Sequence, residues 1–235
     1  MAFKDAMPSV LLENVVNLIH SKIPNSQAKQ VEQFAQCLYT HMSRDDLNVR
    51  NDSDLYGAVV SLWNALNKTA PSDTHIRVFN PTQSKHGWQS SHSVIEVIQP
   101  DMPFLVDSLA MALNRMGITA HVMLHTPLAV VRDKKSVTEV SFVNNAPKNS
   151  DNIAVFLIEI DKQSSDADIK AIEKEIQSVL ADVVASVVDW EKMSAKLTDT
   201  IQQLPKRPFP GDKAELTEAV NYLTYLNNHH FTLLG

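Results

Sequence analysis

The spacing of the hydrophobic residues changes at Pro71, and this change constrains the fold more than any other feature of the sequence. Before it, apolar residues recur every three or four positions, which is the spacing of amphipathic helices. Three such stripes run through residues 11–19, 31–42 and 55–66. After Pro71, short runs rich in β-branched and aromatic residues alternate with helical stretches. We therefore expect a helical segment at residues 1–71 and an α+β domain at residues 72–204.

The α+β region has a recognisable order of elements. Strands are expected at residues 75–79, 93–98, 118–124, 128–132, 137–143 and 153–160. Pro127 is expected to interrupt the strand that starts at residue 118 before it continues at residues 128–132. Helical spacing returns at residues 104–116 and 166–204. From residue 92 on, the order strand, helix, strand, strand or hairpin, strand, helix resembles a split βαβ, or ferredoxin-like, plan. That plan predicts a mostly antiparallel sheet with helices on one face. The strand that should follow its last helix is not evident in the sequence.

Residues at the expected helix ends favour particular caps. Asp52 or Ser53 suits the N-cap of the third helix, and Ser165 followed by Asp168 resembles a capping box. Pro103 suits the first turn of the helix at residues 104–116. Gly117 follows the last turn of that helix, where a left-handed residue is usual, so we expect a positive φ there.

The helical pattern at residues 166–204 is too long for one helix of a small domain. At ~1.5 Å per residue an unbroken helix would span roughly 58 Å. We expect it to break, to project, or to pack on neighbours. The proline-rich residues 205–212 are expected to form a linker. Residues 213–235 are expected to begin a further, truncated module, with a helix followed by a strand-like run from His230.

The composition excludes several classes of function. Five glycines stand where average usage of ~7% would give about 16, and no Rossmann turn, P-loop or nucleophile elbow is present. A net charge of −6 argues against nucleic acid as a partner. The longest apolar run, residues 153–158, is far shorter than a ~20-residue membrane span, and no signal peptide is recognisable. Cys37 is the only cysteine, which favours a cytoplasmic protein with Cys37 as a small buried hydrophobe.

The segment that joins the strand at residues 93–98 to the next helix is the best candidate for a binding site. Unsatisfied backbone N–H groups at the start of a helix favour an anionic or hydrogen-bonding partner. The candidate residues are Asp101, Met102, Pro103, Phe104, Asp107 and Ser108. The alternative is that Asp101 simply caps the helix while Asp107 and Ser108 are solvated or bonded locally. Asp101 and Asp107 are not expected to act as an acid–base pair, because they lie more than one helical turn apart.

The histidines do not predict a metal site. His121 and His125 have the spacing of zinc ligands on a helix, but Val122 replaces the glutamate of the metalloprotease motif. On a strand the two would lie ~13 Å apart, too far to share a metal directly. His229 and His230 have no third ligand nearby in the sequence. We therefore expect no metal ligands and no catalytic residues in this chain.

Several motifs occur together that resemble one protein family. The longest is Asp101-Met-Pro-Phe-Leu-Val-Asp-Ser108. The others are Asp54-Leu-Tyr-Gly57 with Trp63, Asn80-Pro81 followed by Gly87-Trp88, Val94-Ile-Glu-Val-Ile98, Arg115-x-Gly117 with Arg132-Asp133, Val188-Asp-Trp190 with Met193, and His230-Phe-Thr-x-Leu-Gly235. They cover most of the chain, which resembles the N-terminal region of the large bacterial NAD-specific glutamate dehydrogenases.

The resemblance implies an ACT-like module, the first of several that precede a catalytic domain. ACT modules commonly bind amino acids at the first strand–helix loop and pair across subunits, so the six candidate residues would form an effector site and the protein would be a homo-oligomer. Phe104 stands where ACT loops usually carry glycine, which permits close approach of a ligand to the backbone. That departure favours a packing role for the loop. NAD would belong to the parent enzyme, and this chain would bind no cofactor.

Three functions follow from these observations. The first is a non-catalytic regulatory and assembly module of an NAD-dependent glutamate dehydrogenase, in contact with the remaining domains of the same chain. The second is a purely structural subunit-packing domain that binds no effector. The third is a stand-alone metal-dependent enzyme, which the spacing of the histidines and of Cys37 does not support.

Overall fold

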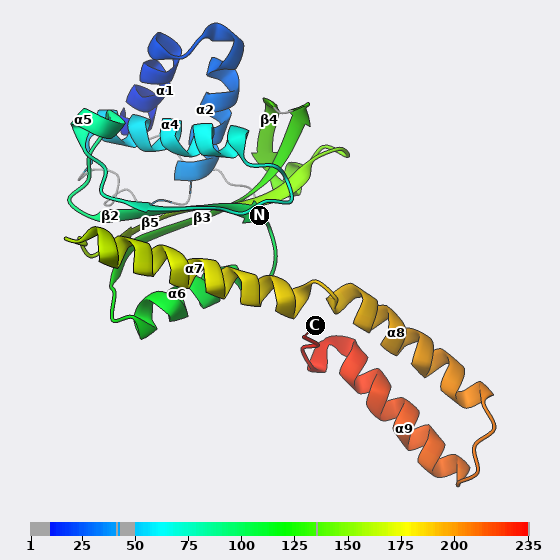
Figure 1. The fold of residues 1–235 in the computed structure, drawn as a ribbon. Coiled ribbons are helices and arrows are strands. Elements are labelled where there is room, and N and C mark those ends of the chain that lie inside the picture. Colours follow the sequence, from blue (N-terminus) through cyan, green and yellow to red (C-terminus); the bar gives the residue numbers. More distant parts are fainter. Residues whose placement is uncertain (1–9, 41, 43–49, 135, 235) are drawn as a thin grey trace.

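The computed structural model describes residues 10–40, 42, 50–134 and 136–234, and it places one sheet between two groups of helices (Figure 1). On one face lie the N-terminal helices α1 (Val10–Lys22), α2 (Asn25–Tyr39) and α4 (Asp52–Lys68). On the other face lie α6 (Leu105–Arg115) and α7 (Asp166–Val187). The expected α+β fold, with an N-terminal helical segment ahead of an ACT-like sheet and a long helix, is confirmed.

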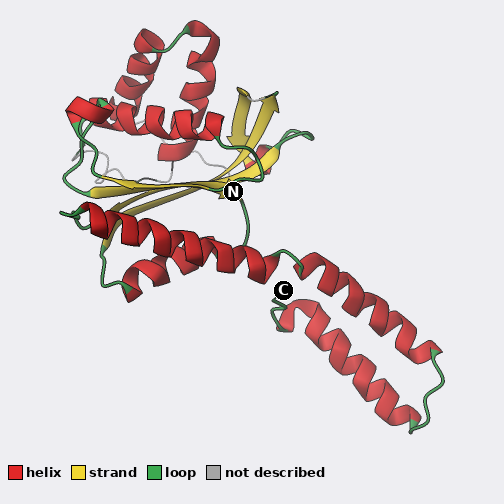
Figure 2. Cartoon of the chain, viewed as in Figure 1, coloured by secondary structure: helices red, strands yellow, loops and turns green. Residues whose placement is uncertain are grey.

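The sheet has five strands in the order β1-β2-β5-β3-β4, and every neighbouring pair is antiparallel. The strands are β1 (His75–Phe79), β2 (Ser93–Pro100), β3 (Ala120–Asp133), β4 (Ser136–Phe142) and β5 (Asp151–Ile160). The hairpin of β3 and β4 bends away from the plane of the other strands (Figure 2). Strand β5 is central, and it pairs with β2 over residues 153–160.

Strand β1 forms the edge of the sheet at which the ferredoxin-like plan would place a strand from after the last helix. The elements β2, α6, β3, β5 and α7 follow the ferredoxin-like plan, with α6 and α7 on one face. That plan places a further strand, from after the last helix, beside the first strand. Here β1, which comes before the unit in the sequence, pairs with β2 at that edge, from His75 opposite Ile98 to Phe79 opposite Val94. Helix α7 also packs against β1, so α7 covers the edge strand as well as the rest of the sheet on that face.

Hydrophobic cores form on both faces of the sheet. Val155 and Leu157 of β5 belong to the core under the N-terminal helices. Phe156 and Ile158 belong to the core under α6 and α7. Because side chains of a strand alternate between faces, a strand covered on both sides must be apolar at nearly every position. This explains the continuous apolar run that predicted a central strand at residues 153–160.

Two expected helix ends are confirmed and two are wrong. Pro103 lies ahead of α6, which begins at Leu105, so it is not in the first helical turn. Gly117 has φ of 70°, and Ser165 caps α7 by accepting the N–H of Asp168. The N-cap of α4 is Asn51, whose side chain accepts the N–H of Ser53, so neither Asp52 nor Ser53 takes that place. Asn51, Asp52 and Ser53 are all residue types that commonly cap helices, and the sequence alone does not show which of them takes the N-cap position.

Pro127 does not interrupt a strand as we expected. Strand β3 runs unbroken through Ala120–Asp133, with Pro127 opposite Ala154 of β5. The pairing of β3 with β4 begins only at Leu128. Pro127 therefore lies where β3 has a partner on one side, which is where a strand tolerates the missing N–H.

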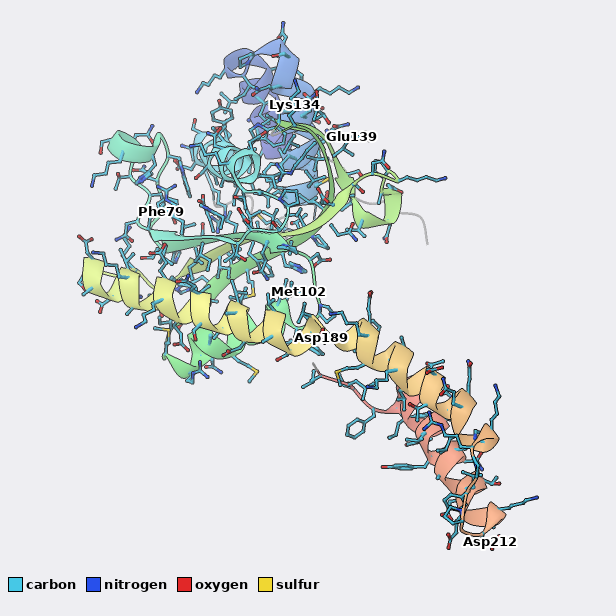
Figure 3. The ribbon with its side chains drawn as sticks, turned by 45° about the vertical axis from the view of Figure 1, so that its right-hand side comes forward. Phe79, Met102, Lys134, Glu139, Asp189 and Asp212 are labelled. Atoms are coloured by element: carbon cyan, nitrogen blue, oxygen red, sulfur yellow. The ribbon has the colours of Figure 1, made fainter. Side chains whose placement is uncertain are left out.

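The long helical pattern breaks at residues 188–189, and its second half projects from the domain. Helices α8 (Trp190–Gln203) and α9 (Lys213–Tyr225) form a hairpin, with Asp189 at its base and Asp212 at its far end (Figure 3). The last buried residue of α7 is Val183, so packing on the sheet no longer holds the helix beyond that point. Neither α8 nor α9 has a buried residue.

Short elements complete the described chain. They are α5 (Gln83–His86), the 3-10 turns Val143–Asn145 and Leu204–Lys206, and a π-helical turn at Leu226–His230. The expected strand from His230 does not form, because residues 231–234 have no strand partner in the part of the chain that the structure describes. Within that same part, no helix combines the length and the apolar character needed to cross a membrane.

Two residues from the sequence motifs pack directly against each other. Trp88 is 3% exposed, and a Cβ added at Gly57 of α4 would lie 2.3 Å from the Cβ of Trp88. Glycine is therefore required here by close approach, and Trp88 is a packing residue. Cys37 is also buried, and burial raises the pKa of its thiol to about 11, which suits an unreactive core residue.

We predict that Gly57→Ala destabilises the protein by more than about 2 kcal/mol, because overpacking at Trp88 outweighs the better helix propensity of alanine. The matched control is Gly87→Asn, where φ is 75° and no atom lies within 4 Å of an added Cβ. It should change the free energy of unfolding by less than about 1 kcal/mol, since asparagine tolerates this conformation. Urea unfolding measures the free energy of unfolding of both variants. Equal losses would contradict the conclusion that the close approach of Trp88 requires glycine at position 57.

Candidate functional site

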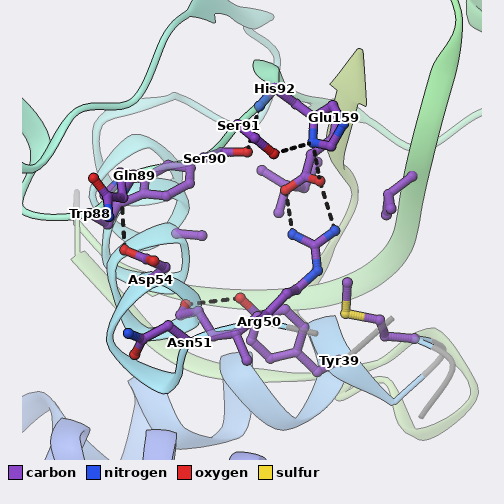
Figure 4. Close-up of a pocket in the computed structure, with 15 residues that line it drawn as sticks. Tyr39, Arg50, Asn51, Asp54, Trp88, Gln89, Ser90, Ser91, His92 and Glu159 are labelled. Atoms are coloured by element: carbon purple, nitrogen blue, oxygen red, sulfur yellow. Dashed lines mark hydrogen bonds and ion pairs between the residues drawn. The ribbon is translucent and has the colours of Figure 1, made fainter. Parts of the chain in front are cut away.

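A cavity of about 410 Å³ lies between the N-terminal helices and the sheet (Figure 4). Its wall is built from the end of α2, the first turns of α4, the loop of residues 88–92 and the ends of β3 and β5. The polar lining residues are Tyr39, Arg50, Asn51, Asp54, Gln89, Ser90, Ser91, His92 and Glu159. The apolar ones are Met42, Leu55, Ala58, Trp88, Val122 and Leu157.

A buried ion pair forms one side of this cavity. The Arg50 guanidinium contacts the Glu159 carboxylate with both terminal nitrogens, at N–O distances of 2.5 and 2.7 Å. The side chain of Glu159 is only 4% exposed and that of Arg50 21%. A carboxylate at this depth requires a paired cation, and the planar fork of arginine satisfies both of its oxygens. The ion pair connects the segment ahead of α4 to the central strand β5.

Two further groups stand beside Glu159. His92 Nδ1 lies 3.5 Å from Glu159 Oε2 and 3.2 Å from the hydroxyl of Ser91. The Tyr39 hydroxyl donates to the backbone carbonyl of Leu55. Burial raises the pKa of Tyr39 far above its usual value, with Arg50 opposing the rise and Glu159 adding to it. Tyr39 therefore stays protonated and acts as a structural donor.

Asp54 holds the loop of residues 88–92 against α4. One of its carboxylate oxygens accepts the backbone N–H of Gln89, at 2.9 Å. This bond places Ser90, Ser91 and His92 along the rim of the cavity (Figure 4). The position of the loop thus depends on a residue of the Asp54-Leu-Tyr-Gly57 motif and on Trp88.

The polar network extends past the cavity along the sheet. The His92 ring lies 4.4 Å from the His121 ring, and His121 Nε2 lies 2.8 Å from Asp161 Oδ1. The pKa of Asp161 is held below its usual value, first by the backbone N–H of Thr119 and then by His121. His121 is therefore a bridging residue at the end of the sheet. In the described residues, no group of three or more His, Cys, Asp or Glu side chains could hold a metal ion.

The candidate residues at 101–108 lie on the opposite face of the sheet. Met102 packs against the core under α6 and α7, and Pro103 is exposed. Phe104, Asp107 and Ser108 line a groove of about 520 Å³ between α6 and α7, together with residues 232 and 234. The structure thus brings three of the six residues to one groove.

Asp101 does not cap α6, so that part of the alternative is wrong, whereas Asp107 is exposed, as the alternative expected. Phe104 occupies the N-cap position, and α6 has no side-chain cap. The Asp101 backbone N–H donates to the carbonyl of Asn152, and its carboxylate lies 3.9 Å from Nε2 of His125. His125 in turn stacks on Phe156 of β5, with ring centroids 4.4 Å apart. Asp101 therefore points towards the sheet.

Phe104 adopts a backbone conformation that favours glycine. Its φ is 72° and its ψ is 0°, in the left-handed region that costs a non-glycine residue roughly 1–2 kcal/mol. The ring is 43% exposed at the edge of the groove. The loop thus makes a left-handed turn at Phe104, with the aromatic side chain at the edge of the groove.

Sequence reasoning missed the cavity at Arg50 and Glu159. Arg50 and Glu159 are 109 residues apart, and no local motif connects them. One signal was present, since Glu159 is the charged residue that ends an otherwise apolar central strand. An ionisable residue within a strand that is covered on both faces requires a partner from another element.

We predict that Arg50→Met destabilises the protein by about 3 kcal/mol, because the Glu159 carboxylate would be left buried without its cation. In a Glu159→Gln background the same substitution should cost about 1 kcal/mol or less, since no charge is stranded. A double-mutant cycle by urea unfolding measures the difference. Equal costs in the two backgrounds would show that the pair contributes no coupling.

Comparison with known proteins agrees with the motifs. A family model described as "Glutamate dehydrogenase, ACT1 domain" matches residues 34–176. The chain is 35% identical over 227 residues to an NAD-specific glutamate dehydrogenase of Halomonas elongata, and 37% identical over 207 residues to one of Pseudomonas aeruginosa. These matches cover 96% and 88% of this chain but only 14% and 13% of the two relatives.

The matched region includes α4, the whole sheet and the loop of residues 101–108. Since the family model covers more than half of the 235 residues, this chain belongs to the family of glutamate dehydrogenase ACT1 domains.

Proposed function

We propose that this chain is a non-catalytic regulatory and assembly module of a cytoplasmic, oligomeric NAD-dependent glutamate dehydrogenase. The parent enzyme would oxidise L-glutamate to 2-oxoglutarate and ammonia with NAD as hydride acceptor. The proposal is supported by the family match and by the printed names of the two relatives, both NAD-specific glutamate dehydrogenases. NAD and the catalytic groups would belong to other parts of the parent chain.

The observation that carries the assembly role is the α8–α9 hairpin. It projects from the sheet (Figure 1), and none of the residues in its two helices is buried. The large hydrophobic residues exposed on it are Trp190, Met193, Phe209, Tyr222 and Tyr225. Apolar side chains gathered on an unsupported hairpin are typical of a surface that packs against another part of an assembly. In the parent, residues 205–212 would link its two helices, and residues 213–235 would lead into the next module.

The regulatory role depends on the loop of residues 101–108. Phe104, Asp107 and Ser108 line one groove, where the carboxylate and the hydroxyl could hold the ammonium group of an amino acid. The alternative, a purely structural packing domain, is favoured by the exposed ring of Phe104 in place of a glycine. The two roles differ in whether any amino acid binds at the loop.

For assembly, we predict that Trp190→Gln combined with Tyr222→Gln weakens oligomer formation of the parent enzyme by at least about 10-fold, because two exposed anchors are lost. Analytical ultracentrifugation measures this. Val10→Gln is the control, since Val10 is 73% exposed but lies on α1. An oligomer that is unchanged in the double variant would rule out the hairpin as an assembly surface.

For regulation, we predict that the common amino acids include one that binds the chain, and that Asp107→Ala and Ser108→Ala each weaken its binding about 10-fold. Isothermal titration calorimetry measures the affinity. Ser72→Ala, in an exposed turn, is the control. Binding that persists in both loop variants would exclude the loop as the sensor, and the purely structural role would then stand.

A further inference from the structure

We propose that the cavity of Figure 4 binds a small organic cation, namely a protonated primary amine on a short apolar body. It is a second site, on the opposite face of the sheet from the loop of residues 101–108. The proposal is independent of the proposed function, because it rests on the shape and charge of the cavity alone.

The cavity has the shape of a small-molecule site. Its volume of about 410 Å³ falls within the usual range for ligand pockets. Side chains of Leu55, Ala58, Trp88 and Leu157, all less than 9% exposed, give it an apolar wall. Polar groups of three separate elements meet at its rim, and such convergence is typical of sites that orient a ligand.

The charges of the lining select a cation. Among the described lining residues, Arg50 and Glu159 form an ion pair, and Asp54 brings their formal charge to −1. The Lys162 ammonium lies outside this lining, where it donates to the Ser90 carbonyl at 3.2 Å. An anionic ligand would need Arg50, but both terminal nitrogens of its guanidinium are bound to Glu159. An ammonium group has three donors and needs only acceptors.

The acceptors for such a group are present on two sides of the cavity. One carboxylate oxygen of Asp54 accepts the Gln89 N–H, and the other has no hydrogen-bond partner among the described residues. Hydroxyl oxygens of Ser90 and Ser91 stand on the same rim. An amine between Asp54 and this rim would join α4 to the loop of residues 88–92.

The test is calorimetry and thermal unfolding of the 235-residue chain with three probes at matched ionic strength. The probes are n-butylammonium, L-norleucine, which carries the same apolar body on an α-amino acid, and butyrate as the anionic control. We expect butylammonium to bind and to raise the melting temperature, and butyrate to do neither. Norleucine should bind at least about 10-fold more weakly than butylammonium, because it adds a carboxylate while Arg50 is already bound to Glu159. Norleucine that binds as tightly as butylammonium would overturn the assignment of the cavity to a cation.

Two variants assign the binding to this cavity. Asp54→Asn keeps the acceptor for Gln89 but removes the charge, so it should weaken binding at least about 10-fold. Ala58→Leu fills the cavity from α4 without a change of charge and should abolish binding. Ser72→Ala, in an exposed turn outside the lining of the cavity, should bind as the wild type does. The proposal is wrong if butyrate binds as well as butylammonium, if no probe binds, or if Asp54→Asn binds with unchanged affinity.

Discussion

Strand β5 is the element on which the rest of the fold depends. It pairs with β2 on one side and with β3 on the other, and its side chains enter both hydrophobic cores in alternation. Because this alternation has a period of two, a shift of one residue would move Val155 and Leu157 to the wrong core. The N-terminal helices, α6 and α7 thus all take their positions from the register of this one strand.

The same alternation explains the buried ion pair. Glu159 follows Leu157 on the face under the N-terminal helices, so its carboxylate enters a space that apolar residues otherwise fill. Burial of an unpaired carboxylate is costly, and Arg50 offsets that cost from outside the sheet. The cavity beside this pair is therefore a consequence of a charge placed at the end of a core strand. It is separated by the sheet from the groove at α6 and α7, which lets one small domain present two chemically different surfaces.

Most helices and strands were predictable because each has its own local signal. Apolar spacing located the helices and strands, and the positive φ of Gly117 and the cap at Ser165 followed from residue type. Predictions were wrong where several adjacent residues suited the same cap, or where pairing with another strand decided whether a strand formed. Pro127 is accommodated because the pairing of β3 with β4 begins only at the next residue, Leu128. The run from His230 has no strand partner among the described residues. The site residues at 101–108 could be named from a motif, but their division between groove and sheet could not.

The sequence by itself determined the fold class, the family and the ends of many elements, since periodicity, caps and motifs are properties of neighbouring residues. Only the tertiary structure decided that β1 completes the sheet edge, that Phe104 takes a left-handed conformation, and that Arg50 meets Glu159. The first and the last of these depend on contacts between distant parts of the chain, which no window of neighbouring residues contains.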